Sequence, residues 1–439
     1  MSGDTRGGLL RRHRDFRLLW CGEVAGKFGA SVTGVAMPLI AVSTLHAGTF
    51  EVSLLSAATW LPWLLIALPA GVWVDRLRRR PIMLAAAAVS LLLFAGVPAA
   101  AWGGLLSIGL LLAVALLAGT AAVFFQTAYS AYLPSILEPA DQPEGNAKLH
   151  GSASAAQIAG IGSGGLIAQL AGAVNGMYAN AATFLVSLLC LAGIRHREPR
   201  PARTERPPRA LVKEIGEGLR LVAGDPWFRT LTAFGAISNV ALVGYQSILV
   251  VFLVRDVGLA PGAVGGLIAA ASTGGVAGAF AARRVAARIG TARATLLFEL
   301  GLALFAVLIP LTFAGAGLLL YVAGGFCVSA GVVAGNVIKA SFQQSYCPPG
   351  LLGRLTASTA FLNYGTIPLG ALLGGALGTA LGVRPAMWIM TAGVPLAALI
   401  LWFSPIRRCR DLPASPSPGM WRAGGDEPAA GPVTSSSLP

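Results

Sequence analysis

The sequence predicts an all-α integral membrane protein with twelve transmembrane helices in two pseudo-symmetric six-helix halves. Only 11% of its 439 residues are charged and 55% are hydrophobic, whereas soluble domains are about 25% charged. The apolar residues form long continuous segments, the length that a helix needs to cross a bilayer, and lack the ten-residue alternation of barrel strands. A Pro- and Arg-rich segment divides these apolar segments into two equal sets.

Each predicted element follows from this pattern. Residues 1–16 form a cytoplasmic N-terminal segment, and residues 17–194 form a first half with spans at 17–44, 51–74, 82–102, 105–133, 149–172 and 175–194. The second half, residues 229–404, has spans at 229–254, 262–282, 292–313, 316–340, 355–379 and 383–404. The cytoplasmic linker 195–228 is extended where proline and arginine alternate and ends in a short interfacial helix after Leu211. Residues 405–439, rich in Pro, Gly and Ser, are predicted to be a disordered cytoplasmic tail.

The formal net charge is +14, and the basic residues are concentrated in the loops on one side of the predicted spans. Basic runs precede span one, follow spans two, eight and twelve, and fill the linker, whereas the opposite loops hold only Arg255 and Arg384. Cytoplasmic loops of membrane proteins carry such an excess, so both termini are predicted to be cytoplasmic. Nucleic-acid binding would instead gather the charge on a polar domain with interleaved aromatics. The Arg- and Ala-rich usage indicates a GC-rich bacterial genome, and therefore a bacterial inner membrane.

No pattern of catalysis or metal binding is present. The five cysteines and four histidines are scattered, so neither a metal site nor a disulfide framework is expected. The Gly-x-x-x-x-Gly-Lys, Gly-x-Ser-x-Gly and His-Glu-x-x-His patterns are missing, which argues against an enzyme and against ATP as the energy source. We therefore expect no cofactor, and an ion gradient, most simply of protons, as the driving force.

The two halves carry a basic loop at matching positions. Gly71-Val-Trp-Val-Asp-Arg-Leu-Arg-Arg-Arg80 follows span two, and Gly278-Ala-Phe-Ala-Ala-Arg-Arg follows span eight. Repeated halves of this kind are typical of secondary transporters. The first loop resembles the signature loop of the major facilitator superfamily. That resemblance implies alternating access of the two halves, with spans one, four, seven and ten lining a central cavity.

The chain also resembles the bacterial drug, macrolide and siderophore exporter branch of that superfamily, the transmembrane secretion effector type. The residues that carry this are Phe16-Arg-Leu-Leu-Trp, Gly22-Glu-Val-Ala-Gly-Lys-Phe-Gly, Leu133-Pro-Ser, Gly145-Asn-Ala-Lys-Leu, Glu214-Ile-Gly-Glu-Gly-Leu-Arg, Leu352-Gly-Arg-Leu-Thr-Ala-Ser and Pro368-Leu-Gly. Four positions depart from the branch pattern, in which Gln126 and Asn180 are often Asp, Ile161 is often Pro and Phe342 is often basic. The departures remove candidate proton carriers and a possible kink.

Charged residues inside the spans are costly and therefore candidates for function. Glu23 and Lys27 lie four residues apart on one face of span one, in the favourable order for an ion pair. Two interpretations stay open: a proton-coupling carboxylate with its partner, or a static pair in which Lys27 reaches the interface. Glu299 in span nine is interpreted as structural, paired near the interface with Arg288 or Arg293.

Polar and aromatic side chains on the four lining spans are the candidate substrate contacts, with core packing as the alternative for the aromatics. They are Gln126, Tyr129, Asn239, Tyr245, Gln246 and Asn336. Trp60 and Trp63 in span two face either the cavity or the lipid interface. Without convergent arginines this set suits a bulky, mostly apolar solute, neutral or cationic, better than a sugar phosphate.

The signature loop predicts a cytoplasmic gate. Asp75 ends span two, where the helix dipole disfavours a carboxylate by about 0.3–1 kcal/mol. The resemblance implies that Asp75 binds the N-terminus of span eleven, at residues 355–358. The expected gate residues are Gly71, Asp75, Arg76, Arg79, Arg80 and Arg354.

We therefore expect a proton-coupled secondary transporter that exports a hydrophobic small molecule, such as an antibiotic. Nutrient import by the same fold is the alternative, and a non-transporting sensor is a third, which should append a folded cytoplasmic domain. The expected partners are a small-molecule substrate, protons and the lipid bilayer, with no nucleic acid, and a monomer is expected.

Overall fold

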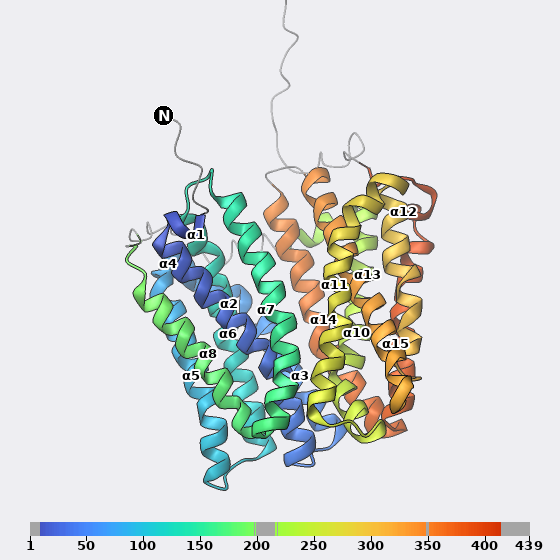
Figure 1. Ribbon diagram of the computed structural model, residues 1–439. Helices are drawn as coiled ribbons and strands as arrows, with labels where there is room; N and C mark the ends of the chain where they lie inside the picture. The colour runs from blue at the N-terminus through green and yellow to red at the C-terminus, as the bar shows by residue number, and fades with distance from the viewer. Residues whose placement is uncertain (1–8, 197, 199–215, 217, 348–350, 414–439) are drawn as a thin grey trace, which may run out of the picture.

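The computed structural model describes residues 9–196, 198, 216, 218–347 and 351–413, without the side chains of Leu68, Val72, Asp75, Arg354 and Ala357. The described residues form helices and no strand. Figure 1 shows two helical bundles side by side, the first half in blue and green and the second in yellow and red. The predicted all-α fold is confirmed.

The first half contains the helices of spans one to six. They are α1 (Leu9–Arg12), α2 (Arg14–Leu39) with the π-helical turn η1 (Ile40–Thr44), α3 (Thr49–Leu65), α4 (Ala67–Arg76), α5 (Arg79–Trp102), α6 (Ile108–Ile136), α7 (Gln142–Ala171) and α8 (Ala173–Gly193). The described part of the linker includes a helical stretch at residues 218–224, where the short interfacial helix is predicted. Most of the linker lies outside the described residues.

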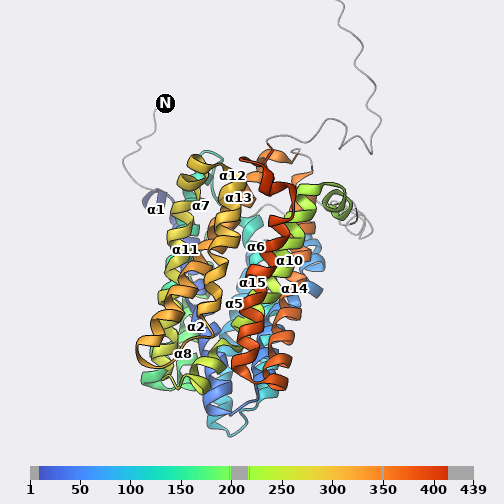
Figure 2. The same cartoon turned by 90° about the vertical axis from the view of Figure 1, so that its right-hand side faces the viewer.

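The second half repeats this arrangement. Its helices are α10 (Pro226–Val251) with η2 (Phe252–Asp256), α11 (Pro261–Ile289), α12 (Thr291–Leu296) with η3 (Leu297–Gly301) and η4 (Ala303–Leu308), η5 (Gly315–Gly317), α13 (Leu318–Tyr346), α14 (Leu352–Leu381), α15 (Val383–Trp402) and η6 (Pro405–Arg408). In Figure 2, α11 and α13 run side by side, while α10 packs on α14 and α15.

Ten helices among the described residues are long and apolar enough to cross a membrane. The remaining two predicted spans are helical too, but span two is broken at Ile66 into α3 and α4. Pro69 explains the break, because its ring excludes the carbonyl of Leu65 from a normal helical hydrogen bond. Span five is α7, whose many small and polar residues keep its hydropathy low, and α7 packs between α2 and α11.

The halves meet along two helix pairs, α3 with α14 and α7 with α11. A Cβ atom built on Gly165 of α7 would lie 2.6 Å from the Cα of Gly265 in α11, so only glycine permits this approach. Arg255 of the second half donates a hydrogen bond to the carbonyl of Ala47 in the first half, at 2.6 Å. These contacts lie at the end opposite α1, where the two halves are held together.

Polar contacts organise the end of the molecule that carries α1, here called the α1 end. Leu9, which is fully buried, donates its backbone N–H to Glu144 Oε1 at 3.2 Å. Glu144 also accepts from Lys148 Nζ at 2.7 Å, and Asp141 binds Arg12 and His13. These contacts dock the short helix α1 on the start of α7.

The C-terminal segment is ordered further than predicted. Residues 405–412, assigned by the sequence to the disordered tail, form η6 and then pack on α12: Ile406 is fully buried, and Asp411 Oδ1 accepts from the N–H of Thr291 at 2.8 Å. Two contacts explain this order: the burial of Ile406 and the cap that the Asp411 carboxylate forms on α12. Both depend on partners that are distant in the sequence, so local composition does not predict them. Residues 414–439 lie outside the described residues.

Candidate functional site

The charged pair predicted in span one contacts span four. On α2, Lys27 Nζ lies 3.5 Å from Glu23 Oε1. Across the helix boundary, Lys27 donates to Gln126 Oε1 of α6 at 3.2 Å. The helical spacing of four residues brings the two charges together, and the packing of α6 adds the amide. We call Glu23, Lys27 and Gln126 the α2–α6 polar cluster.

The members of this cluster differ in their access to the surroundings. The side chain of Glu23 is only 7% exposed, whereas that of Lys27 is 42% exposed. Tyr129, one turn beyond Gln126, is buried and stacks on Phe125 with ring centroids 6.3 Å apart. The arrangement presents a cation at an accessible position and keeps its carboxylate partner covered.

The departures from the exporter pattern have structural consequences. Asn180 of α8 is fully buried and donates a hydrogen bond to Thr33 of α2. An aspartate there would carry a charge into this contact between two helices of one half, so the amide serves packing. Gly160 faces the backbone carbonyl of Phe28 at close range, which supports packing as the role of the glycine-rich stretch.

The candidates in the second half occupy several environments. Asn239 of α10 donates to the carbonyl of Asn363 in α14 at 3.2 Å, so its amide joins two helices. Tyr245 is buried within the core, while Gln246 and Asn336 are exposed. The described contacts do not join these residues to the α2–α6 polar cluster, so the predicted set is brought together only in part.

An aromatic cluster bridges the two halves. Trp60 and Trp63 of α3 lie 6.2 Å apart, and the ring of Tyr364 in α14 lies 6.1 Å and 5.6 Å from them. Tyr364 is 40% exposed, so the cluster offers an accessible aromatic surface. The sequence analysis singled out both tryptophans but missed Tyr364, because nothing local to span eleven distinguishes it from a packing tyrosine.

The predicted partner of Glu299 is wrong. The carboxylate pairs with Lys339 of α13, at 2.8 Å between Oε1 and Nζ, and lies within the π-helical turn η3. Lys339 Nζ also lies 5.0 Å from the ring centroid of Phe234. Arg288 and Arg293 are near in sequence, but the helix packing of α13 against η3 determines the partner. The sequence analysis did not single out Lys339 as the partner of Glu299.

The signature loop is anchored to the end of α8 and to the linker that follows it. Arg79 Nη1 binds Glu198 Oε1 at 3.2 Å, and Arg80 donates to the carbonyls of Leu191 and Ala192 at the end of α8. Gly71 has open space where a side chain would lie, and Arg76 is exposed. The side chains of Asp75 and Arg354 lie outside the described residues, so the predicted contact with α14 stays a prediction.

The sequence is similar to those of known proteins along most of its length. The Multidrug efflux pump Tap of Mycolicibacterium fortuitum is 28% identical over 429 residues, 95% of this chain and 100% of the relative. The pump of the same name from Mycobacterium tuberculosis (strain ATCC 25618 / H37Rv) is 29% identical over 396 residues, covering 88% of this chain and 92% of the relative.

A solved structure shares the fold. A bacterial homologue of the iron transporter ferroportin in the inward-facing state superposes with a TM-score of 0.73, at 15% identity, over 90% of this chain and 99% of that one. The sequence model described as Major Facilitator Superfamily matches residues 19–368. The helical halves, the apolar spans and these likenesses agree: the chain is a multi-pass membrane transporter and belongs to the Major Facilitator Superfamily.

Proposed function

We propose that this protein exports hydrophobic small molecules, such as antibiotics or other secondary metabolites, in exchange for protons. The observation that carries the proposal is the α2–α6 polar cluster, in which a covered carboxylate is paired with an accessible ammonium inside the first half. Charged groups at this depth are expensive and mark ion pathways in transporters. The similar relatives named as multidrug efflux pumps support export of drug-like molecules.

The cluster suggests how proton and substrate compete. While Glu23 is ionised, it balances the charge of Lys27. A proton on Glu23 removes this balance and leaves Lys27 with Gln126 as its described partner, so the ammonium turns toward water. Proton binding and release at Glu23 therefore change the charge presented by α2, and one site can alternate between proton and substrate.

Alternating access is the proposed transport cycle. The glycine approach of α7 to α11 and the bond from Arg255 to Ala47 hold the halves together at the end opposite α1. With the α1 end predicted to be cytoplasmic, this geometry supports an inward-facing state. Tyr364 and the two tryptophans lie between α3 and α14, so a planar apolar substrate can stack on residues of both halves.

The test uses inside-out membrane vesicles and the fluorescent hydrophobic cation ethidium as the probe. We expect the unaltered protein to accumulate ethidium when an acid-inside pH gradient is imposed. Glu23→Gln should abolish this accumulation while the protein remains in the membrane, because the neutral amide cannot exchange a proton. The matched control, Glu138→Gln, changes an exposed carboxylate between α6 and α7 and should transport normally. Normal accumulation by Glu23→Gln would refute the assignment, and efflux from the vesicles in place of accumulation would indicate import.

A further inference from the structure

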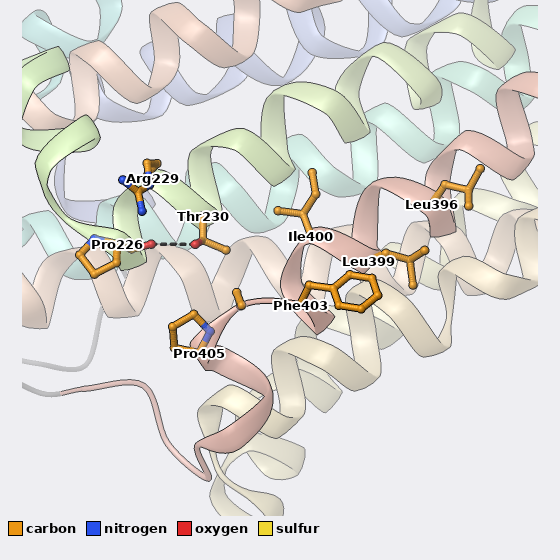
Figure 3. Close-up of a pocket in the computed structure, with 9 residues that line it drawn as sticks. Pro226, Arg229, Thr230, Leu396, Leu399, Ile400, Phe403 and Pro405 are labelled. Carbon is orange, nitrogen blue, oxygen red and sulfur yellow. Dashed lines mark hydrogen bonds between the residues drawn. The ribbon is translucent and has the colours of Figure 1, made fainter.

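A groove on the outside of the second half is unrelated to the transport site. It lies where α10 begins and α15 ends, has a volume of about 510 Å³ and is shown in Figure 3. Its walls come from two packed helices and from the turn that leads into η6. The lining residues are Pro226, Arg229, Thr230, Leu396, Leu399, Ile400, Phe403, Ser404 and Pro405.

The polarity of the groove changes along its length. Leu396, Leu399 and Ile400 lie in the last two turns of α15, before Phe403, and Leu396 is 62% exposed. Arg229, Thr230 and Ser404 lie at the α1 end, where both helices terminate. In Figure 3 the leucine and isoleucine side chains line one side and Arg229 lies at the other end. The groove therefore runs from an apolar portion to a cationic one.

Among the described residues, no acidic side chain forms an ion pair with the positive charge at this end. Arg229 is exposed, and the ion pairs of the described residues do not include it. The nearest acidic residue in sequence, Asp225, is buried and accepts bonds from the N–H groups of Trp227 and Phe228 and from the hydroxyl of Tyr346. The turn beyond Pro405 adds two exposed arginines, Arg407 and Arg408.

Aromatic residues place the groove at the membrane interface. Phe403 is 80% exposed and Trp402 is 41% exposed, and the guanidinium of Arg407 lies 5.2 Å from the Trp402 ring. Tryptophan and basic residues gather at the headgroup level of a bilayer. The α1 end carries the basic loops and is predicted to face the cytoplasm, so the groove opens into the cytoplasmic leaflet.

We propose that the groove binds an anionic phospholipid of the cytoplasmic leaflet. The phosphate lies on the guanidinium of Arg229, which suits a phosphate by charge and by its forked donors. One acyl chain lies along Leu396, Leu399 and Ile400, the apolar portion of the groove. Basic pockets between transmembrane helices at the cytoplasmic side bind acidic lipid headgroups in this way. The bound lipid joins the start of α10 to the end of α15.

Native mass spectrometry of the purified full chain tests the proposal. We expect phosphatidylglycerol to be retained in preference to phosphatidylcholine of the same acyl chains. Arg229→Gln should lower retention of phosphatidylglycerol about fivefold, the contribution of one basic residue near an acidic lipid surface. Retention of phosphatidylcholine should fall less, because its choline group already offsets the charge of the phosphate. The matched control, Arg283→Gln, changes an exposed arginine at the α1 end of α11 and should retain both lipids as before.

Two further measurements separate lipid from free phosphate. Glycerol 3-phosphate at the same concentration should not displace phosphatidylglycerol, because it lacks the acyl chain that the groove accommodates. Leu399→Gln should lower retention of phosphatidylglycerol by disturbing the apolar portion. Equal retention of the two lipids by the unaltered protein, unchanged retention by Arg229→Gln, or displacement by glycerol 3-phosphate would each overturn the proposal.

Discussion

Glu299 and Lys339 form an ion pair inside the second half, with side chains only 5% and 18% exposed. Gly335 lies directly against the carboxylate, at a position where any side chain would collide with Glu299. Taking charges out of water costs several kcal/mol per ion, and the pair repays this only while both partners are present. The two residues must therefore be considered together.

We predict that Lys339→Met strongly destabilises the protein, by about 3–5 kcal/mol, because it leaves the carboxylate buried without a cation. The double variant Glu299→Met with Lys339→Met should recover most of this loss. Thermal unfolding in detergent measures both. Lys148→Met, which removes the partner of the more exposed Glu144, is the control and should change stability by less than about 1 kcal/mol. Equal unfolding temperatures for Lys339→Met and the unaltered chain would contradict the prediction.

At the scale of single residues, the sequence predicts contacts between residues that lie close together in the chain. Glu23 and Lys27 can be paired from their spacing because both lie on one turn of one helix. The partners Gln126, Lys339 and Tyr364 lie on other helices, respectively 99, 40 and 304 residues from Lys27, Glu299 and Trp60. Only helix packing selects them. Several arginines lie closer in sequence to Glu299 than Lys339 does, so a local rule chose the wrong partner.

At the scale of elements, α1 is attached to α7 by a titratable contact. Glu144 lies in the first turn of α7, before the predicted span. Its pKa is held below the ordinary value by the hydrogen bond from Lys148 and by that from the N–H of Leu9. A lowered pKa in the folded state means that the contact contributes fully above the ordinary carboxyl pKa and is lost as the pH falls through the lowered one.

We therefore predict that α1 stays docked at neutral and mildly acidic pH and loosens only below about pH 4.3, the ordinary value for a glutamate. Hydrogen exchange at Leu9, expressed as a protection factor, measures this. Glu144→Gln should lower the protection at neutral pH to the level that the unaltered chain shows in acid. Glu138→Gln, beyond the reach of this contact, should leave it unchanged. Protection at Leu9 that does not respond to Glu144→Gln would exclude the contact as the cause.

The helices themselves were largely predictable, and their ends less so. Apolar length predicted a helix at the place of each span, and ten of the described helices are long and apolar enough to cross a bilayer. Several helices extend beyond the apolar core into polar residues, as α7 does by starting at Gln142 where the span was predicted to start at 149. A hydropathy profile does not detect such turns, because they are polar. Water or neighbouring loops provide the hydrogen-bond partners for their polar groups.

At the scale of the whole molecule, the distribution of basic loops predicts the orientation. Reporter fusions at Pro143 should report the cytoplasm, and a fusion at Gly103, between α5 and α6, should report the opposite side. A further fusion at Arg206 in the linker should agree with Pro143. Activity at Arg206 of a reporter that functions only outside the cytoplasm would contradict the prediction of twelve spans with both termini in the cytoplasm.

The proposed gate also belongs to the whole molecule. Asp75→Asn should lower transport, with little loss of protein, and shift the population toward the inward-open state, because the amide binds the N-terminus of α14 more weakly than the carboxylate. Labelling from the cytoplasm of Asn336→Cys, in a chain whose five native cysteines are replaced, measures the shift. The same labelled chain with Asp75 intact is the reference. Unchanged labelling together with normal transport would show that no such gate operates.

The interruption of span two at Ile66 separates the two tasks of that helix. Its first piece, α3, packs against α14 of the other half, while its second piece, α4, contacts α6 within its own half and carries the signature loop. Since Pro69 prevents a continuous ladder of hydrogen bonds through this point, bending at Ile66 costs less than bending an intact helix. The signature loop after α4 is therefore less rigidly coupled to the aromatic cluster on α3 than it would be through an intact helix.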